Sequence, residues 1–172
     1  MLSLFIYDGV VPLNWVQKIQ ENNFLSLFYR ISPLFYSISG ILVLMLHKTM
    51  QKYDDTFWWI TFGVMLIIQG LCSYMSDVEY WGQNSYWEII DTFIATILTL
   101  VAGPLVIFRA FNGYATYPFY FNIIWICCAT FSLYCKYMSN QCIQVLNAEH
   151  YLFWHALWHC MPLYASFLIL LL

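Results

Sequence analysis

The chain has 172 residues and a formal net charge of -3, and 62% of its residues are hydrophobic, 21% aromatic and 9% charged. A soluble domain usually carries about a quarter charged residues, so this composition excludes a water-soluble domain and predicts one integral membrane domain over residues 1–172. The chain also has no block of Lys and Arg with which to neutralise phosphates, which excludes nucleic acid as a partner. Membrane lipids and other membrane-protein subunits remain as expected partners.

The first 23 residues are apolar but lack the basic start of a signal peptide, and they contain Asp8 and Pro12. We therefore expect residues 1–23 to form a short segment at the membrane interface.

Long apolar runs follow, and about 20 apolar residues are what a helix needs to cross the hydrocarbon core. The fold class predicted is all-α, a polytopic transmembrane bundle of about five spans. These spans are expected at residues 31–47, 57–76, 87–108, 117–137 and 149–172. Proline removes a backbone donor and clashes with the preceding turn, so a break at Gly103 and Pro104 would give six spans instead. The Lys and Arg residues are balanced between the two predicted sides, which leaves the orientation and the identity of the membrane open.

Six cysteines occur without a CxxC pair, and five of them fall in apolar helical stretches. These are Cys72, Cys127, Cys128, Cys135 and Cys160. We expect them to pack as small apolar side chains, with no redox role implied.

Polar residues recur where three of the predicted spans meet the same membrane face. In the second span, one helix face carries Gln69, Ser73, Ser76 and Asp77. Near the start of the third span lie Glu88 and Asp91, and near the start of the fifth lie His155 and His159. An ionisable residue inside a span costs roughly 2.5 to 3.5 kcal/mol, so it indicates a function or a buried partner. The pattern predicts a polar pocket open to one face.

His155 and His159 are four residues apart, so their imidazoles point the same way and can share one metal ion. A catalytic zinc typically takes three protein ligands and a water. Candidates for the third ligand are Asp77, Asp91 and Glu88, whereas His150 is turned about 140° away from His155 along the helix. Two other readings stay open: ligation of haem or pigment, and hydrogen-bonded interior histidines.

The segment SDVEYWGQNSYWEIID, residues 76–91, followed much later by HALWH, residues 155–159, resembles the CREST superfamily of membrane hydrolases. That superfamily includes alkaline ceramidases, adiponectin and progestin receptors, and lipases that remodel GPI anchors. Its members carry Ser-x3-His at the end of one span, Asp at the start of the next and His-x3-His in the last. Ser76, Asp91 and the two histidines of HALWH match this order.

The chain departs from the family at the first histidine, where Tyr80 stands. Sliding the alignment to Ser73 places Asp77 there instead, and a carboxylate oxygen can bind zinc. The chain is also shorter than the seven-span pattern of the family, so the resemblance covers about half of it.

The resemblance implies a zinc-dependent hydrolase of a lipid amide or ester. The implied metal ligands are His155, His159 and Asp77, and the implied catalytic residues are Asp91, as general base, and Ser76, as donor to the oxyanion. The alternative is a non-catalytic structural subunit of a larger membrane complex, which would bind lipid, haem or pigment. The shorter chain and the missing histidine favour that alternative, and the ordered motifs favour the hydrolase.

Overall fold

The computed structural model describes residues 13–50, 56–81, 83, 85–105, 108, 112 and 120–170. Every regular element in those ranges is a helix, which confirms the predicted all-α class. The elements are α1 (Leu13–Ile19), α2 (Phe24–Ile31), α3 (Leu34–Met50), α4 (Thr56–Tyr74), η2 (Met75–Glu79), α5 (Tyr86–Ile97), η3 (Leu98–Ala102), α7 (Tyr120–Gln144) and α8 (Ala148–Leu170). Residues 1–12 of the expected interfacial segment lie outside the described residues. The rest of that segment, residues 13–23, contains α1.

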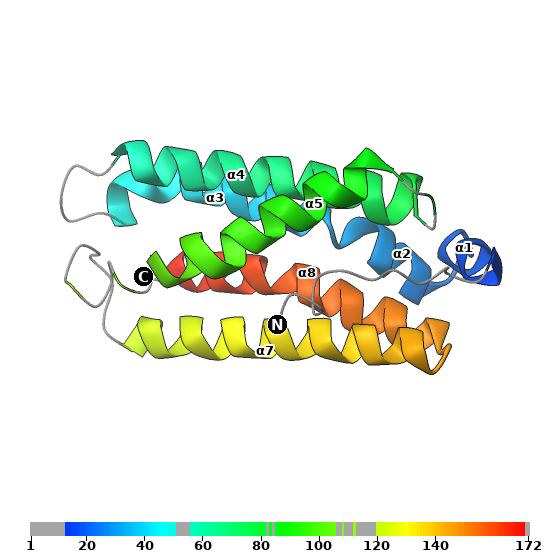
Figure 1. The fold of residues 1–172 in the computed structure, drawn as a ribbon. Coiled ribbons are helices and arrows are strands. Elements are labelled where there is room, and N and C mark those ends of the chain that lie inside the picture. Colours follow the sequence, from blue (N-terminus) through cyan, green and yellow to red (C-terminus); the bar gives the residue numbers. More distant parts are fainter. Residues whose placement is uncertain are drawn as a thin grey trace.

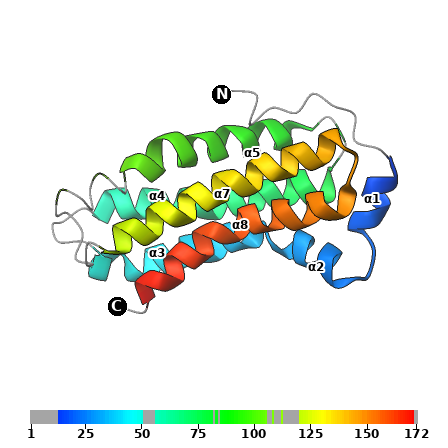
Figure 2. The ribbon, with the colours of Figure 1, turned by 90° about the horizontal axis from the view of Figure 1, so that it is seen from below.

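The helices form a layered bundle (Figure 1). The hairpin of α3 and α4 makes one layer, the hairpin of α7 and α8 makes the other, and α5 crosses obliquely against α4. Figure 2 shows the same bundle from below, with α7 and α8 side by side. The connection between η2 and α5, the turn between α7 and α8, and helices α1 and α2 all lie at one end. The three polar segments therefore share one end of the bundle, as predicted from the alternation of the spans across the membrane.

Among the residues that the structure describes, fewer helices qualify as membrane spans than the five expected. Two are long and apolar enough, Thr56–Glu79 and Tyr86–Leu105, and Phe24–Ile31 with Leu34–Lys48 makes a third if this bent pair is one span. The later helices α7 and α8 occupy the expected positions, but Lys136 and a polar stretch near the end of α7, and the histidines of α8, dilute their apolar runs. These two helices therefore lie where they were expected, but they are less apolar than expected.

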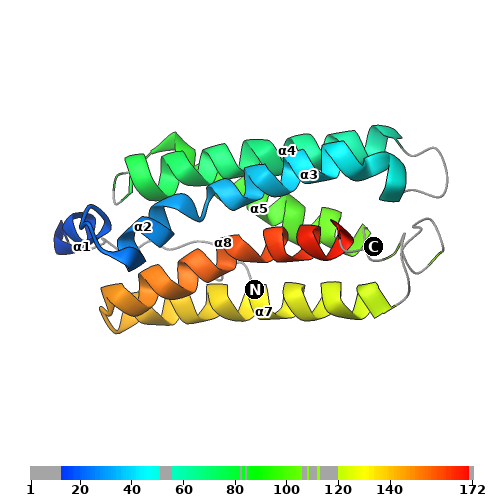
Figure 3. The same cartoon turned by 180° about the vertical axis from the view of Figure 1, so that it is seen from behind.

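Two chain features bring α2, α3 and α4 into close contact. Pro33 has no backbone N–H and separates α2 from α3, whose axes differ by 44°. Figure 3 shows α2 leading through this bend into α3. Across the hairpin, a Cβ on Gly70 would overlap Ser37 and meet the Pro33 carbonyl oxygen at 3.0 Å. Glycine at position 70 thus allows α4 to pack directly against the bend.

In the described part of the chain, two wide helical turns, η2 and η3, replace regular α-helix. In η2, the N–H of Tyr80 donates to the carbonyl of Met75 at 2.9 Å, five residues back. In η3, the N–H of Gly103 donates to the carbonyl of Leu98 in the same way. The helix then continues to Leu105. Pro104 is therefore accommodated by a widened turn, and the chain is not broken there into the two short helices of a six-span arrangement.

The described residues form two apolar clusters, one in each layer. One joins α3, α4 and η3 through Tyr36, Val43, Trp59, Phe62, Leu66 and Leu98. The other joins α1, α2, α7 and α8 through Trp15, Ile19, Tyr29, Cys142, Ile143, Ala148, Tyr151, Leu152 and Ala156. Of the cysteines expected to pack, Cys72, Cys135 and Cys160 are buried, Cys128 is half-buried and Cys127 is exposed. Cys127 is thus the exception to the packing prediction.

Candidate metal centre

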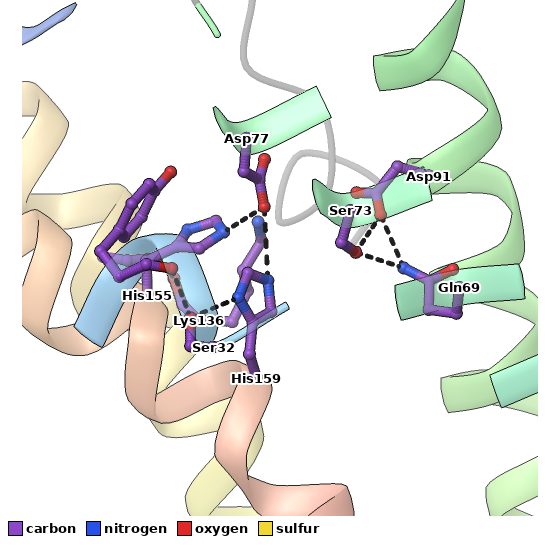
Figure 4. A network of polar contacts seen from close by, with 10 residues as sticks. Ser32, Gln69, Ser73, Asp77, Asp91, Lys136, His155 and His159 are labelled. Carbon is purple, nitrogen blue, oxygen red and sulfur yellow. Dashed lines mark hydrogen bonds and ion pairs between the residues drawn. The ribbon is translucent and has the colours of Figure 1, made fainter. Parts of the chain in front are cut away.

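Asp77, His155 and His159 meet at the polar end of the bundle, between η2 and α8 (Figure 4). The Asp77 Oδ2 atom lies 3.2 Å from Nε2 of His155 and 3.4 Å from Nε2 of His159. All three residues are buried, and one ligand atom from each lies within 4.8 Å of the others. Two separate parts of the chain therefore converge on one point with three metal-binding groups.

These separations fit a shared ion. Zinc binds nitrogen and oxygen ligands at about 2.0 to 2.2 Å, and in a tetrahedron this places neighbouring ligand atoms about 3.4 Å apart. The two nitrogen-to-oxygen distances, 3.2 and 3.4 Å, lie close to that edge length. The donor set, two imidazoles and one carboxylate, is one that catalytic metal sites use. The residues present could therefore hold a metal ion.

Local helix geometry explains this convergence. His155 and His159 are one turn apart on α8, and their ring centroids are 4.7 Å apart. Asp77 sits in the middle of η2, where the wide turn changes the direction in which successive side chains leave the helix. Wide turns of this kind are frequent at functional sites.

The outer nitrogens of the two imidazoles differ in their surroundings. His159 Nδ1 lies 3.0 Å from the hydroxyl oxygen of Ser32, at the end of α2. His155 Nδ1 is buried and has no hydrogen-bond partner among the described residues. The His155 ring packs against two aromatic rings, with centroid distances of 5.1 Å to Tyr151 and 5.7 Å to Tyr29. A hydrogen-bond partner thus meets the outer nitrogen of His159, whereas the outer nitrogen of His155 lies among aromatic rings.

A second polar cluster, formed by Gln69, Ser73 and Asp91, joins α4 to α5 (Figure 4). Gln69 Nε2 donates to Asp91 Oδ1 at 2.7 Å and to the Ser73 hydroxyl at 2.9 Å. The Ser73 hydroxyl donates to the same Asp91 oxygen. Both described hydrogen bonds to Asp91 end on Oδ1, so neither occupies Oδ2. Asp91 and Asp77 are near enough to interact electrostatically.

Lys136 of α7 adds a positive charge to this end of the bundle. Its side chain extends toward the Asp77 carboxylate in Figure 4. The ammonium interacts electrostatically with Asp77, Asp91, His155 and His159. The site therefore combines two carboxylates, two imidazoles and one half-buried lysine.

The structure brings together some of the residues singled out from the sequence and leaves others apart. Asp77, His155 and His159 form the cluster expected of metal ligands. Asp91 is hydrogen-bonded to Ser73, and no described hydrogen bond joins it to Ser76, which is buried in η2. Glu88, another ligand candidate, is exposed, and so is His150, which helix geometry had disfavoured as a ligand.

Sequence reasoning did not assign Ser32 or Lys136 to the site. Ser32 could have been recognised as a candidate, because it directly precedes a proline in an apolar stretch. A lysine within a predicted span was a signal for Lys136, because such a charge indicates a function or a partner.

Comparison with known proteins adds no relative: no family model, curated protein or solved structure matches the chain. The resemblance to CREST proteins therefore stays a prediction that rests on the short motifs.

Proposed function

We propose that this protein is a metal-dependent hydrolase of a lipid amide or ester, related to the CREST superfamily, with Asp77, His155 and His159 as the metal ligands. The observation that carries the proposal is the convergence of these three buried groups within 4.8 Å. Three protein ligands leave a tetrahedral position open, which distinguishes catalytic zinc sites from the closed, four-ligand structural sites. Zinc is the metal expected, although two histidines and a carboxylate also suit non-haem iron.

A bound divalent ion would supply Lewis acidity, lowering the pKa of water towards about 7 and polarising a carbonyl. Among the residues of this chain, Asp91 is the first with a proposed role in the reaction. Its Oδ1 is held by Gln69 and Ser73, which fixes the carboxylate plane. Its Oδ2 is then the atom proposed to accept a proton from the attacking water.

Ser76 is the proposed donor to the oxyanion. It directly precedes Asp77 in η2 and is buried. Among the described residues its hydroxyl has no hydrogen-bond partner, whereas the Ser73 hydroxyl is engaged by Asp91. This difference favours Ser76 over Ser73 for a group that must turn toward a substrate.

A lipid substrate is supported by the surface next to the site. Exposed apolar side chains follow one face of α4, at Phe57, Ile60, Val64, Ile68 and Leu71. This stripe leads along the helix toward η2. The site lies near one end of a span of membrane length, and the ends of such spans approach the interfacial region of a bilayer. Amide and ester carbonyls of lipids lie near that depth.

Lys136 favours one competing role, that of a metal-free structural subunit. A positive charge beside Asp77 can neutralise the carboxylate without any ion, and buried charges in proteins are usually paired. In that case the histidines would hold the helices together by hydrogen bonds. The two roles make opposite predictions for metal content.

The test is to purify the protein in detergent without added metal and to measure zinc and iron by mass spectrometry. The same preparation would be assayed for fatty-acid release from ceramides and phospholipids. We expect close to one ion per chain and release from at least one lipid class. A chain that holds no ion even after incubation with zinc or ferrous iron contradicts the metal centre. Metal bound without release from any lipid contradicts the hydrolase and leaves a metal-binding subunit.

A further inference from the structure

The carbonyl of Tyr29 lacks its usual helical partner. In an α-helix the N–H four residues later would donate to it. That residue is Pro33, which has no N–H. The Ser32 hydroxyl lies 2.9 Å from this carbonyl oxygen and donates to it. A carbonyl can only accept, so the direction of this hydrogen bond is fixed by chemistry.

This first hydrogen bond determines the second. A serine hydroxyl has a single proton, and here that proton points at the Tyr29 carbonyl. In its 3.0 Å contact with His159 Nδ1, the Ser32 oxygen must therefore accept. Nδ1 of His159 then carries a proton. In a neutral imidazole only one nitrogen is protonated, which leaves Nε2 with a free lone pair.

We propose that Ser32 is a positioning residue that holds His159 as its Nδ1-protonated tautomer and aims an unprotonated Nε2 at Asp77. The value of this tautomer for metal binding rests on the function proposed above. Nε2 of His159 lies 3.4 Å from a carboxylate oxygen, which is itself an acceptor. Two acceptors facing each other at this distance are stabilised when a cation lies between them. Histidines that bind metals usually donate their other N–H to a neighbouring oxygen in this way.

The bend at Pro33 and the metal centre are thus coupled through one side chain. Ser32 is fully buried, as is His159 at 1% exposure, so solvent does not compete for either hydrogen bond. The Tyr36 ring contacts the His159 ring edge at a centroid distance of 5.7 Å and restricts ring flipping.

The tautomer can be read directly by ¹⁵N NMR on histidine-labelled protein at about pH 8, where an ordinary imidazole is neutral. The His159 signals are identified by their loss in His159→Asn. We expect the parent, without metal, to show Nδ1 of His159 as the protonated nitrogen. An Nε2-protonated His159 in the parent overturns the proposal, and this readout needs neither metal nor turnover.

Variants then test the role of Ser32. In Ser32→Ala we expect a mixture of both tautomers and a Co²⁺ affinity lower by about 10- to 100-fold, the usual effect of losing such a partner. Ser32→Thr keeps a hydroxyl and should retain the parent's Co²⁺ absorption spectrum. The matched control is Ser39→Ala, because Ser39 is equally buried in α3 and donates to the Phe35 carbonyl at 2.8 Å. That change should leave both readouts unchanged.

The outcomes separate the two proposals. A parent that binds no Co²⁺ but shows the Nδ1-protonated tautomer refutes the metal centre and supports the role of Ser32 in tautomer selection. A parent that binds Co²⁺, with Ser32→Ala unchanged in tautomer and affinity, refutes that role and leaves the metal centre intact. If Ser32→Ala does not fold, the parent tautomer still decides the question.

Discussion

Gln69 and Asp91, 22 positions apart in the sequence, are joined by a 2.7 Å hydrogen bond from the Gln69 amide to Oδ1 of the carboxylate. This bond links α4 to α5 beside the candidate metal centre. It leaves the second carboxylate oxygen for chemistry, so the cluster serves both the packing of the helices and the proposed reaction.

The first prediction separates these two uses of Asp91. Asp91→Asn keeps an oxygen that can accept from Gln69 and Ser73 but removes the basic carboxylate, so fatty-acid release should fall by at least about 100-fold. Metal content and detergent melting temperature should stay near those of the parent. Glu88→Gln, an exposed carboxylate on the same helix, is the control and should keep full release. An active Asp91→Asn protein would show that this residue is not the base.

The second prediction concerns the ligands of the metal. Asp77→Ala, His155→Ala and His159→Ala should each lower bound zinc to less than about a tenth of the parent's, because two remaining ligands hold an ion weakly. The control is His150→Ala, which removes an exposed histidine of α8. Zinc would be measured by mass spectrometry after dialysis. Full stoichiometry in any of the three ligand variants contradicts this site.

The third prediction uses the positive charge of Lys136. Lys136→Met keeps an unbranched apolar stem and removes the charge, so Co²⁺ should bind at least about tenfold more tightly, because like charges repel and this repulsion is only weakly screened inside a protein. Lys136→Arg keeps the charge and should bind Co²⁺ about as the parent does. Both affinities can be measured by absorbance titration. Weaker Co²⁺ binding in Lys136→Met would mean that the lysine supports the site and does not oppose the ion.

The fourth prediction concerns the contact between α3 and α4. A Cβ on Gly40 would overlap the Gly63 carbonyl oxygen and lie 2.9 Å from the backbone nitrogen of Ile67. Backbone atoms cannot move aside cheaply, so Gly40→Ala should destabilise the fold by about 1 to 3 kcal/mol. Gly103→Ala is the matched control, because its nearest contact would be the Leu98 carbonyl oxygen at an ordinary 3.4 Å. A melting temperature of Gly40→Ala equal to the parent's would refute this close packing.

The fifth prediction tests which ends of the bundle share a side of the membrane. Single cysteines at Gln83, before α5, and at His150, in the first turn of α8, should be labelled from the same side in a background without native cysteines. A cysteine at Lys48, near the end of α3, should be labelled from the opposite side. Labelling of positions 83 and 150 from opposite sides would contradict an α7 and α8 hairpin inserted alongside the other helices.

Much of this arrangement could be predicted because it depends on periodicity. The lengths of the apolar runs predicted where the helices lie. The alternation of the spans across the membrane predicted that Asp77, Asp91 and the two histidines share one end. The number of qualifying spans was overestimated, because Lys136 and the two histidines were counted within the apolar runs at residues 117–137 and 149–172. The free-energy cost of placing these residues in a membrane depends on whether they face a polar site, and the length of an apolar run does not reveal that.

The finer geometry of the site could not be predicted, since it depends on irregular backbone. Ser76 was paired with Asp91 by motif spacing, whereas the hydroxyl hydrogen-bonded to Asp91 is that of Ser73. The link from Ser32 to His159 spans 127 positions. It depends on the bend that Pro33 creates, and no periodic pattern encodes such a long-range contact.

The wide turn of η2 makes the site sensitive to chain length as well as to residue type. Each residue of an α-helix advances the direction of the side chain by about 100°, so deleting Met75 would let the turn relax to a regular helix and swing Asp77 away from α8. Apolar length would hardly change, and the protein would still insert. A one-residue deletion in this turn is therefore expected to leave an intact membrane protein with no metal centre.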